Sequence, residues 1–137
     1  MDGKVLVQRI FDEIVNQGNM DVIEELMAED FVDHGPMGDV EGLEAFKGSI
    51  AAFRAAVPDM HCEVSHLIVE GDIAGWVVRS TGTHTGDQLG FPATNKSFDT
   101  LSANIGRMRD GKAVEHWAEQ GMFPMLLQLG VLPPMGG

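Results

Sequence analysis

The hydrophobic periodicity of the chain changes near residue 60, and this change restricts the fold more than any other feature. Before it, apolar residues recur every three or four positions, as in amphipathic helices. They predict a helix over residues 3–17 and a longer one, ending before Pro58, that carries Leu43, Phe46, Ile50, Phe53 and Val57. After it, apolar runs between turn-forming residues predict strands at 61–70, 73–85, 97–108 and 112–120. Helices followed by hairpin strands predict an α+β fold, in which an antiparallel sheet curls around the N-terminal helices.

The segments between these elements are shorter. Asp21 is a candidate N-cap for a short helix that carries Ile23, Leu26 and Met27. Residues 33–38 and 86–96 contain several turn formers and are predicted to be loops. Residues 122–129 are predicted to form a closing helix, and the tail, 131–137, is expected to be loosely ordered.

The composition excludes several classes of protein. A length of 137 residues suits one domain spanning the chain. The net charge of −12 repels phosphate backbones and anionic lipids, so neither nucleic acid nor a membrane is an expected partner. No apolar run approaches the roughly 20 residues that cross a bilayer, and the N-terminus does not read as a signal peptide. Cys62 is the only cysteine, so no intrachain disulfide is possible and a cytoplasmic location is expected.

Alternation of side chains along the last two strands sorts their polar residues onto two faces. One face of the final strand carries Val114, His116 and Ala118, and the other carries Glu115, Trp117 and Glu119. On the preceding strand, one face carries Phe98, Thr100, Ser102, Asn104 and Gly106, whereas Asp99, Leu101, Ala103 and Ile105 lie on the other.

Four short stretches, taken in order and spacing, carry a resemblance to a known family. They are Gly82-Thr83-His84-Thr85-Gly86, Gly90-Phe91-Pro92-Ala93-Thr94, Asp110-Gly111-Lys112-Ala113-Val114-Glu115-His116-Trp117 and Leu127-Gln128-Leu129-Gly130. The chain resembles the SnoaL-like polyketide cyclases (ester cyclases), which belong to the nuclear transport factor 2-like superfamily with its cystatin-like fold. The resemblance implies a cone-shaped sheet with a deep pocket, in which a few polar groups decide the chemistry.

The resemblance also identifies the pocket face, and there the chain departs from the family. In the cyclases the last two strands present a glutamine, a histidine, a second histidine and the catalytic aspartate. These places are held here by Ser102, Asn104, His116 and Ala118. The family's proton-shuttling carboxylate is therefore replaced by a methyl group, and only one histidine is kept.

Two residues are predicted to move protons in place of the missing aspartate. His116 is expected in the pocket by analogy with the family, and an imidazole there can donate or accept a proton. Asp33 lies where the family has a loop near the pocket mouth and can supply a carboxylate. The alternatives are a structural histidine and a turn in which the Asp33 side chain binds its own backbone. The residues predicted to bind substrate are His34, Ser102, Asn104, Ala118, Phe91 and Met122.

No cofactor or metal is predicted, because the five histidines lack metal-binding spacings and no nucleotide-binding motif is present. The predicted function is proton transfer on a small hydrophobic carbonyl-bearing substrate, with intramolecular aldol cyclisation of a polyketide-type ester as the leading reaction. The alternatives are a ligand-binding protein without catalysis, and an isomerase, dehydratase or epoxide hydrolase on the same fold. A homodimer is also predicted, because the face carrying Leu101, Ala103, Ile105 and Trp117 is too apolar to leave in water.

Overall fold

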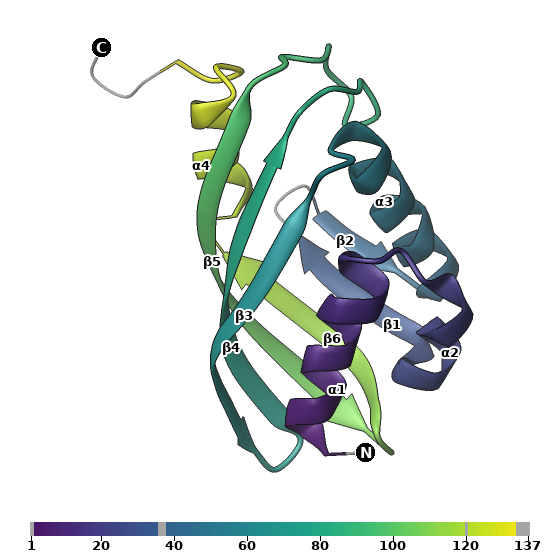
Figure 1. The fold of residues 1–137 in the computed structure, drawn as a ribbon. Helices are drawn as coiled ribbons and strands as arrows, with labels where there is room; N and C mark the ends of the chain where they lie inside the picture. The colour runs from purple at the N-terminus through teal and green to yellow at the C-terminus, as the bar shows by residue number, and fades with distance from the viewer. Residues whose placement is uncertain (1, 36–37, 120, 134–137) are drawn as a thin grey trace.

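The computed structural model describes residues 2–35, 38–119 and 121–133. The helical segments in chain order are α1 (Gly3–Arg9), the π-helix η1 (Ile10–Val15), the 3-10 turn η2 (Met20–Val22), α2 (Ile23–Leu26), α3 (Leu43–Ala56) and α4 (Met122–Gln128). The strands are β1 (Met27–Gly35), β2 (Gly38–Glu41), β3 (His61–Glu70), β4 (Ile73–Thr83), β5 (Ser97–Arg109) and β6 (Lys112–Glu119). Figure 1 shows these elements with their labels.

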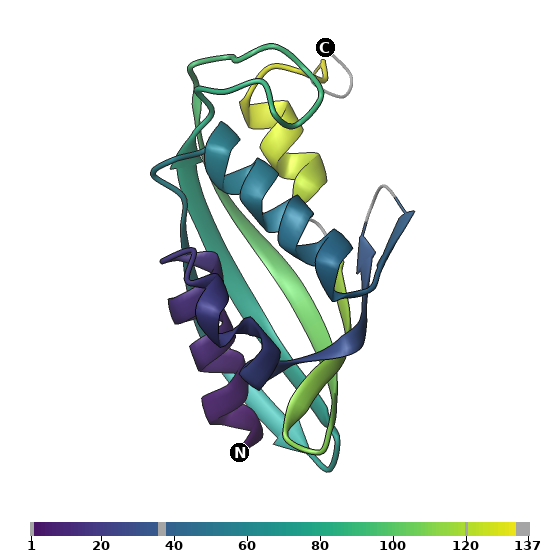
Figure 2. The same cartoon turned by 90° about the vertical axis from the view of Figure 1, so that its right-hand side faces the viewer.

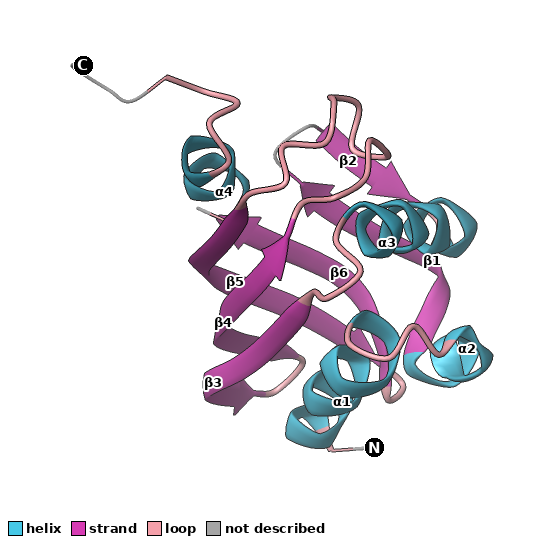
Figure 3. Ribbon diagram, turned by 45° about the horizontal axis from the view of Figure 1, so that its top comes forward, coloured by secondary structure: helices cyan, strands magenta, loops and turns pink. Residues whose placement is uncertain are grey.

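The strands form one curled sheet in the order β2-β1-β6-β5-β4-β3. Figures 2 and 3 show that α1 and α3 lie along one side of this sheet. The predicted α+β class is confirmed. The sheet is mixed rather than wholly antiparallel, because β1 runs parallel to β6 whereas the other neighbouring pairs are antiparallel.

The predicted N-terminal helix is present, but its second half is a π-helix. Val7, Ile14 and Val15 are buried, so the apolar stripe that they form in the sequence faces the core as expected. The Asn16 N–H donates to the Phe11 carbonyl, five residues back, which is the π-helical pattern. The Arg54 guanidinium of α3 donates to the carbonyls of Val15 and Asn16 and so satisfies the end of this segment.

The segment between the first and third helices differs most from the prediction. The short helix is entered through η2, in which Asn19 rather than Asp21 provides the cap by accepting from the Asp21 N–H. Met27, predicted to be helical, begins β1. Residues 33–35, predicted as a loop, are the end of β1, and Gly38 begins β2. Pairing with β6 and β2 makes this segment a strand, and that long-range pairing overrides its turn-forming composition.

The hairpins after residue 60 agree with the prediction. Asp110 and Gly111, both with positive φ, form the two-residue turn between β5 and β6. The predicted loop 86–96 contains no helix or strand. His84 is fully buried, accepts a hydrogen bond at Nδ1 from the Thr94 N–H and so ties the ends of the loop together.

Two side-chain amides cover the backbone at free sheet edges. Asn16 donates to the Cys62 carbonyl and accepts from its N–H, so the outer side of β3 is partnered there. Gln128 of α4 makes the same double contact with Asp99, in the part of β5 that β6 does not reach. These contacts block edge-to-edge pairing with another chain and attach η1 and α4 to the sheet.

The closing helix is found one residue shorter than predicted, and Met125 and Leu129 bury its inner side. The amides of Val131 and Leu132 both donate to the Leu126 carbonyl, so the start of the expected loose tail is tied to α4. The rest of that tail, 134–137, lies outside the described residues. Among the residues that are described, no helix has the length and apolar character needed to cross a membrane.

Candidate active site

A cavity of about 310 Å³ lies between the sheet and the helices. Its walls are mainly apolar, with Val7, Phe11, Ile50 and Phe53 on the helical side and Trp76 and Val78 on the sheet. The polar residues predicted to act on a substrate meet here, because Asp33, Ser102, Asn104 and His116 all line the cavity. A mostly apolar cavity with a few convergent polar groups is the usual form of a small-molecule site.

Asp33 and His116 form the centre of this polar group. They are direct partners in the parallel β1–β6 pair, so the strand register places both side chains on the inner face. His116 Nδ1 lies 2.8 Å from Asp33 Oδ1, and both side chains are about four-fifths buried. The residue types predicted to move protons are therefore in direct contact.

Asn104 fixes the protonation of the other side of the imidazole ring. Its amide nitrogen lies 3.2 Å from the Ser102 carbonyl oxygen and 3.1 Å from Ser102 Oγ. Since that carbonyl can only accept, the amide oxygen of Asn104 must face His116, and Nε2–H donates to it at 2.7 Å. The hydrogen-bond network thus assigns a proton to Nε2.

With Nε2 protonated, a hydrogen bond between Nδ1 and Asp33 Oδ1 needs one further proton, which either atom can carry. When the proton is on Nδ1, the pair is an imidazolium and a carboxylate; when it is on the carboxyl, the imidazole is neutral and accepts it. Both arrangements have no net charge, which suits an apolar cavity better than an isolated carboxylate. Exchange of this proton is what a general acid–base site requires.

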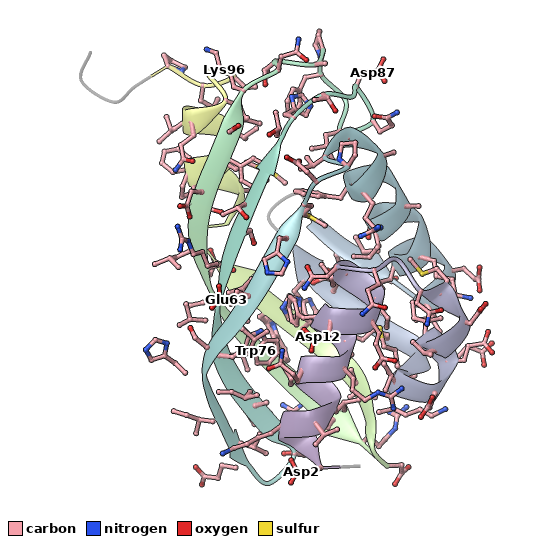
Figure 4. All side chains as sticks on the ribbon, in the orientation of Figure 1. Asp2, Asp12, Glu63, Trp76, Asp87 and Lys96 are labelled. Atoms are coloured by element: carbon pink, nitrogen blue, oxygen red, sulfur yellow. The ribbon has the colours of Figure 1, made fainter. Side chains whose placement is uncertain are left out.

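The indole ring of Trp76 packs on the imidazole of His116 and is itself supported by Phe11. Trp76 stacks on the imidazole with ring centroids 5.8 Å apart and 23° between the planes, and Phe11 meets Trp76 edge-on. Figure 4 shows Trp76 between the sheet and the N-terminal helix. Sequence reasoning missed this role of Trp76. Its signal was available, since Trp76 pairs with Asn104 across β4 and β5 and strand alternation puts both on the inner face.

His34, predicted to bind substrate, lies on the outer face of the sheet. Its Nδ1 is 2.8 Å from Asp39 Oδ1 and its Nε2 is 2.9 Å from Glu115 Oε2, while the ring stacks on Trp117. Hydrogen bonds to Glu115 and Asp39 raise the pKa of His34 above its ordinary value. We call His34, Asp39 and Glu115 the outer cluster.

The three other residues predicted to bind substrate do not line the cavity. Ala118 pairs with Asn104 across β5 and β6 and is half-buried. Phe91 packs on His84 in the 86–96 loop, and Met122 packs on the core from α4. Cys62 does line the cavity, and burial raises the pKa of its thiol, as expected for an unreactive cysteine.

Metal ligation finds no support in the part of the chain that the structure describes. Within it, no group of three or more His, Cys, Asp or Glu side chains is placed to hold an ion. The histidines are instead held individually: His116 by Asp33 and Asn104, His34 by the outer cluster, and His84 by Thr94.

Comparison with known proteins identifies the family. Residues 5–129 match the SnoaL-like polyketide cyclase family, and the chain belongs to it. Family membership supports a general cyclase-type role, and the predicted resemblance is confirmed. No curated protein sequence matches the chain.

Solved structures agree with this placement. IdmH of Streptomyces antibioticus, assigned as a polyketide cyclase, is 30% identical with a TM-score of 0.79, over 95% of this chain and 99% of that one. A protein of Jannaschia sp. CCS1, assigned as a SnoaL-like polyketide cyclase, is 26% identical with a TM-score of 0.84, over 95% and 92%. AclR of Streptomyces galilaeus, assigned as a hydroxylase, is 27% identical with a TM-score of 0.79, over 95% and 96%. Relatives with different assigned reactions share this fold, so the reaction has to be argued from the cavity.

Proposed function

We propose that the protein is a cofactor-independent enzyme that closes a ring in a small, mostly apolar polyketide-type ester by an intramolecular aldol reaction. The observation that carries this proposal is the contact between Asp33 and His116 inside the cavity, in a chain where Ala118 holds the place of the family's aspartate. A carboxylate from β1 then replaces the one that β6 carries in the family.

The reaction needs one proton acceptor that later returns the proton. In the first step the carbon between two carbonyl groups loses a proton to Asp33, and the electron pair of the C–H bond forms an enolate. The enolate carbon then bonds to a second carbonyl carbon of the same molecule, whose π electrons move to its oxygen. That alkoxide takes a proton from the Asp33–His116 pair, which returns to its starting state. The product is an isomer of the substrate, so no oxidant, reductant or co-reactant is consumed.

Three features of the cavity favour these steps. Asp33 Oδ1 contacts His116, whereas Oδ2 makes no hydrogen bond within the described residues and can face a substrate. Asn104 holds the imidazole in one orientation, so the pair is preorganised before substrate enters. The apolar walls exclude water and fold a flexible chain so that the reacting carbons meet, which removes much of the entropic barrier.

A ligand-binding protein without catalysis is the second candidate, and Ala118 is the observation that favours it. Epoxide hydrolysis by an aspartate–arginine–aspartate set is less compatible with the arrangement. Arg79 and Asp99, which would supply part of that set, pair with each other on the exposed outer face. They therefore lie on the opposite side of the sheet from Asp33.

A direct test uses an anthracycline-precursor ester that carries a 1,3-dicarbonyl group. The proposal predicts conversion to a product of the same mass with a new ring, followed by mass spectrometry and absorbance. Binding of the ester, measured by quenching of tryptophan fluorescence, without any conversion would favour the ligand-binding candidate. Absence of both binding and conversion would contradict both candidates.

We also propose that a second copy of the chain covers the outer face of β5. Leu101 and Ile105 are 61% and 50% exposed there, and Ile105 pairs with Trp117 of β6. Removing this apolar surface from water would stabilise a homodimer. Leu101→Glu is expected to shift the sedimentation coefficient from dimer to monomer, whereas Glu63→Gln, on the exposed edge strand, should not. A monomeric native protein at micromolar concentration would contradict this proposal.

A further inference from the structure

The outer cluster lies directly behind the proposed catalytic pair, across the same two strands. Asp33 and His34 are consecutive on β1, and Glu115 and His116 are consecutive on β6. Because side chains alternate along a strand, each pair sends one side chain to the inner face and the other to the outer face. On the inner face β1 supplies the carboxylate and β6 the imidazole. On the outer face β1 supplies the imidazole and β6 the carboxylate. Any movement of β1 at this point displaces both contacts together.

The backbone alone holds this end of β1 weakly. The β1–β6 pairing shifts register between Met27 and Val32, and the continuous pairing that follows spans only Val32, Asp33 and His34. Beyond it lies β2, an edge strand of four residues that is mostly exposed. Short exposed edge strands have few interactions to keep them in place.

His34 joins three strands at this weak point. From β1 it reaches Asp39 on β2 with one ring nitrogen and Glu115 on β6 with the other. Its ring also stacks on Trp117 at a centroid distance of 5.0 Å and an angle of 16°. Glu115 is held in turn by Arg107 of β5 at 3.3 Å, and Arg107 contacts Asp72. The connection therefore continues to the β3–β4 turn.

We infer that His34 is a positioning residue: by joining Asp39 of β2 to Glu115 of β6 on the outer face, it holds Asp33 against His116 on the inner face. This inference rests on the proposed function for its catalytic consequence, but its structural content can be measured without a substrate. His34 acts through Asp33 and does not line the cavity itself, whereas Glu115 and Arg107, to which it is connected on the outer face, are both among the lining residues.

The charge of His34 matters because both of its partners are carboxylates. The ring must carry protons on both nitrogens to donate to Asp39 and Glu115 together, and these contacts raise the pKa of His34. Raising the pH through that pKa removes one donor, so one of the two contacts is lost. The groups that face His34 are Asp39, Glu115 with its partner Arg107, and the uncharged ring of Trp117. The contacts of His34 with Asp39 and Glu115 are thus expected to weaken at pH values above the pKa of His34.

The test compares His34→Gln and His34→Arg with His61→Gln, an exposed histidine on β3 that serves as the matched control. The first measurement is the ¹⁵N NMR signal of His116 Nδ1, which senses the contact with Asp33. His34→Gln is expected to shift this signal, His34→Arg to restore it in part, and His61→Gln to leave it unchanged. A native-like His116 signal in folded His34→Gln would overturn the inference.

The second measurement is kinetic and separates the two proposals. His34→Gln should lower kcat about tenfold with KM changed less than threefold, and adding it to Asp33→Asn should cost nothing more, since both act through one contact. A shifted His116 signal in a protein whose native form has no activity would leave the inference standing and overturn the proposed function. A native-like signal and native kcat in His34→Gln would overturn the inference and leave the proposed function standing. Should His34→Gln fail to fold, Asp39→Asn removes one contact only and must move the signal in the same direction, or the inference fails.

Discussion

The inner and outer faces of the β1–β6 pair carry two histidine–carboxylate contacts of nearly equal length, 2.8 Å for Asp33–His116 and 2.9 Å for His34–Glu115. The inner histidine is held by one carboxylate and a neutral amide among aromatic rings, whereas the outer one is held by two carboxylates near solvent. Two carboxylates favour the cationic form of the outer ring and raise its pKa, whereas the inner ring faces one carboxylate and one neutral acceptor. Distance alone does not distinguish a structural contact from a reactive one; the second partner does.

The largest effect is expected on the inner face. His116→Ala and Asp33→Asn should each lower kcat for the ester by about 10²-fold or more, the usual scale for loss of a general acid–base group. Steady-state kinetics measures this effect, with circular dichroism to show that the variants fold. Near-native kcat in both variants would place the proton carrier elsewhere.

A smaller effect is expected when the second partner of His116 is removed. Asn104→Leu deletes the acceptor of Nε2–H, which frees the proton to move to Nδ1 and releases the ring. Loss of one buried hydrogen bond is worth about 1–3 kcal/mol, so kcat should fall roughly tenfold. Asn104→Asp keeps an acceptor but gives His116 a second carboxylate partner, as His34 has, and should also lower kcat. A native kcat in Asn104→Leu would contradict the role of Asn104 in fixing the imidazole.

Restoring the family's carboxylate at position 118 should raise, rather than lower, the activity of the inner-face site. Ala118 is half-buried beside Asn104, so Ala118→Asp is expected to fold at a cost of about 1 kcal/mol from partial desolvation. It should raise cyclase activity severalfold by adding a second base. Urea unfolding and steady-state kinetics measure the two effects. Unchanged activity in a folded variant would show that a carboxylate at position 118 does not reach the cavity.

The smallest effect is expected on the outer face. The pKa of His34 is raised in the folded protein, so its stabilising contribution is full at pH values below its unfolded pKa and is lost as the pH rises through the folded one. The difference in Tm between the native protein and His34→Gln should therefore be larger at pH 6 than at pH 9. Differential scanning calorimetry measures this difference, and His61→Gln should show none. A pH-independent difference would mean that His34 contributes packing rather than charge.

Local periodicity predicted the helices, the hairpins after residue 60 and the alternation of side chains along the last two strands. The resemblance to the family then identified the face with Ser102, Asn104 and His116 as the pocket face. The sequence predicted β1 and β2 poorly. Asp33 and His34 were read as a loop, and both were assigned to the pocket because the family has a loop near the pocket mouth at that place. Their strand is made by pairing with a segment some 80 residues away, which no local pattern records. Once it is a strand, alternation must separate the two residues.

The other discrepancies also arise from tertiary packing. Phe91 and Met122 come from a loop and a helix whose placement depends on His84 and on the attachment of Gln128 to β5. Their hydrophobic character could be read from the sequence, but their distance from the cavity could not. Trp76, by contrast, was not predicted at the cavity but lies there. Its strand and its face could be predicted from the sequence, whereas its stacking on His116 depends on how strongly the sheet curls.

The central claim is that the Asp33–His116 pair transfers a proton to and from carbon inside the cavity. The most direct measurement is hydrogen–deuterium exchange at the activated carbon of a 1,3-dicarbonyl ester in D₂O, followed by ¹H NMR, because it detects proton removal whether or not a ring forms. The native protein should accelerate exchange well above the buffer rate, and Asp33→Asn and His116→Ala should each bring it close to that rate while His61→Gln does not. Exchange in the native protein no faster than in buffer, or exchange unaffected in Asp33→Asn, would contradict the account.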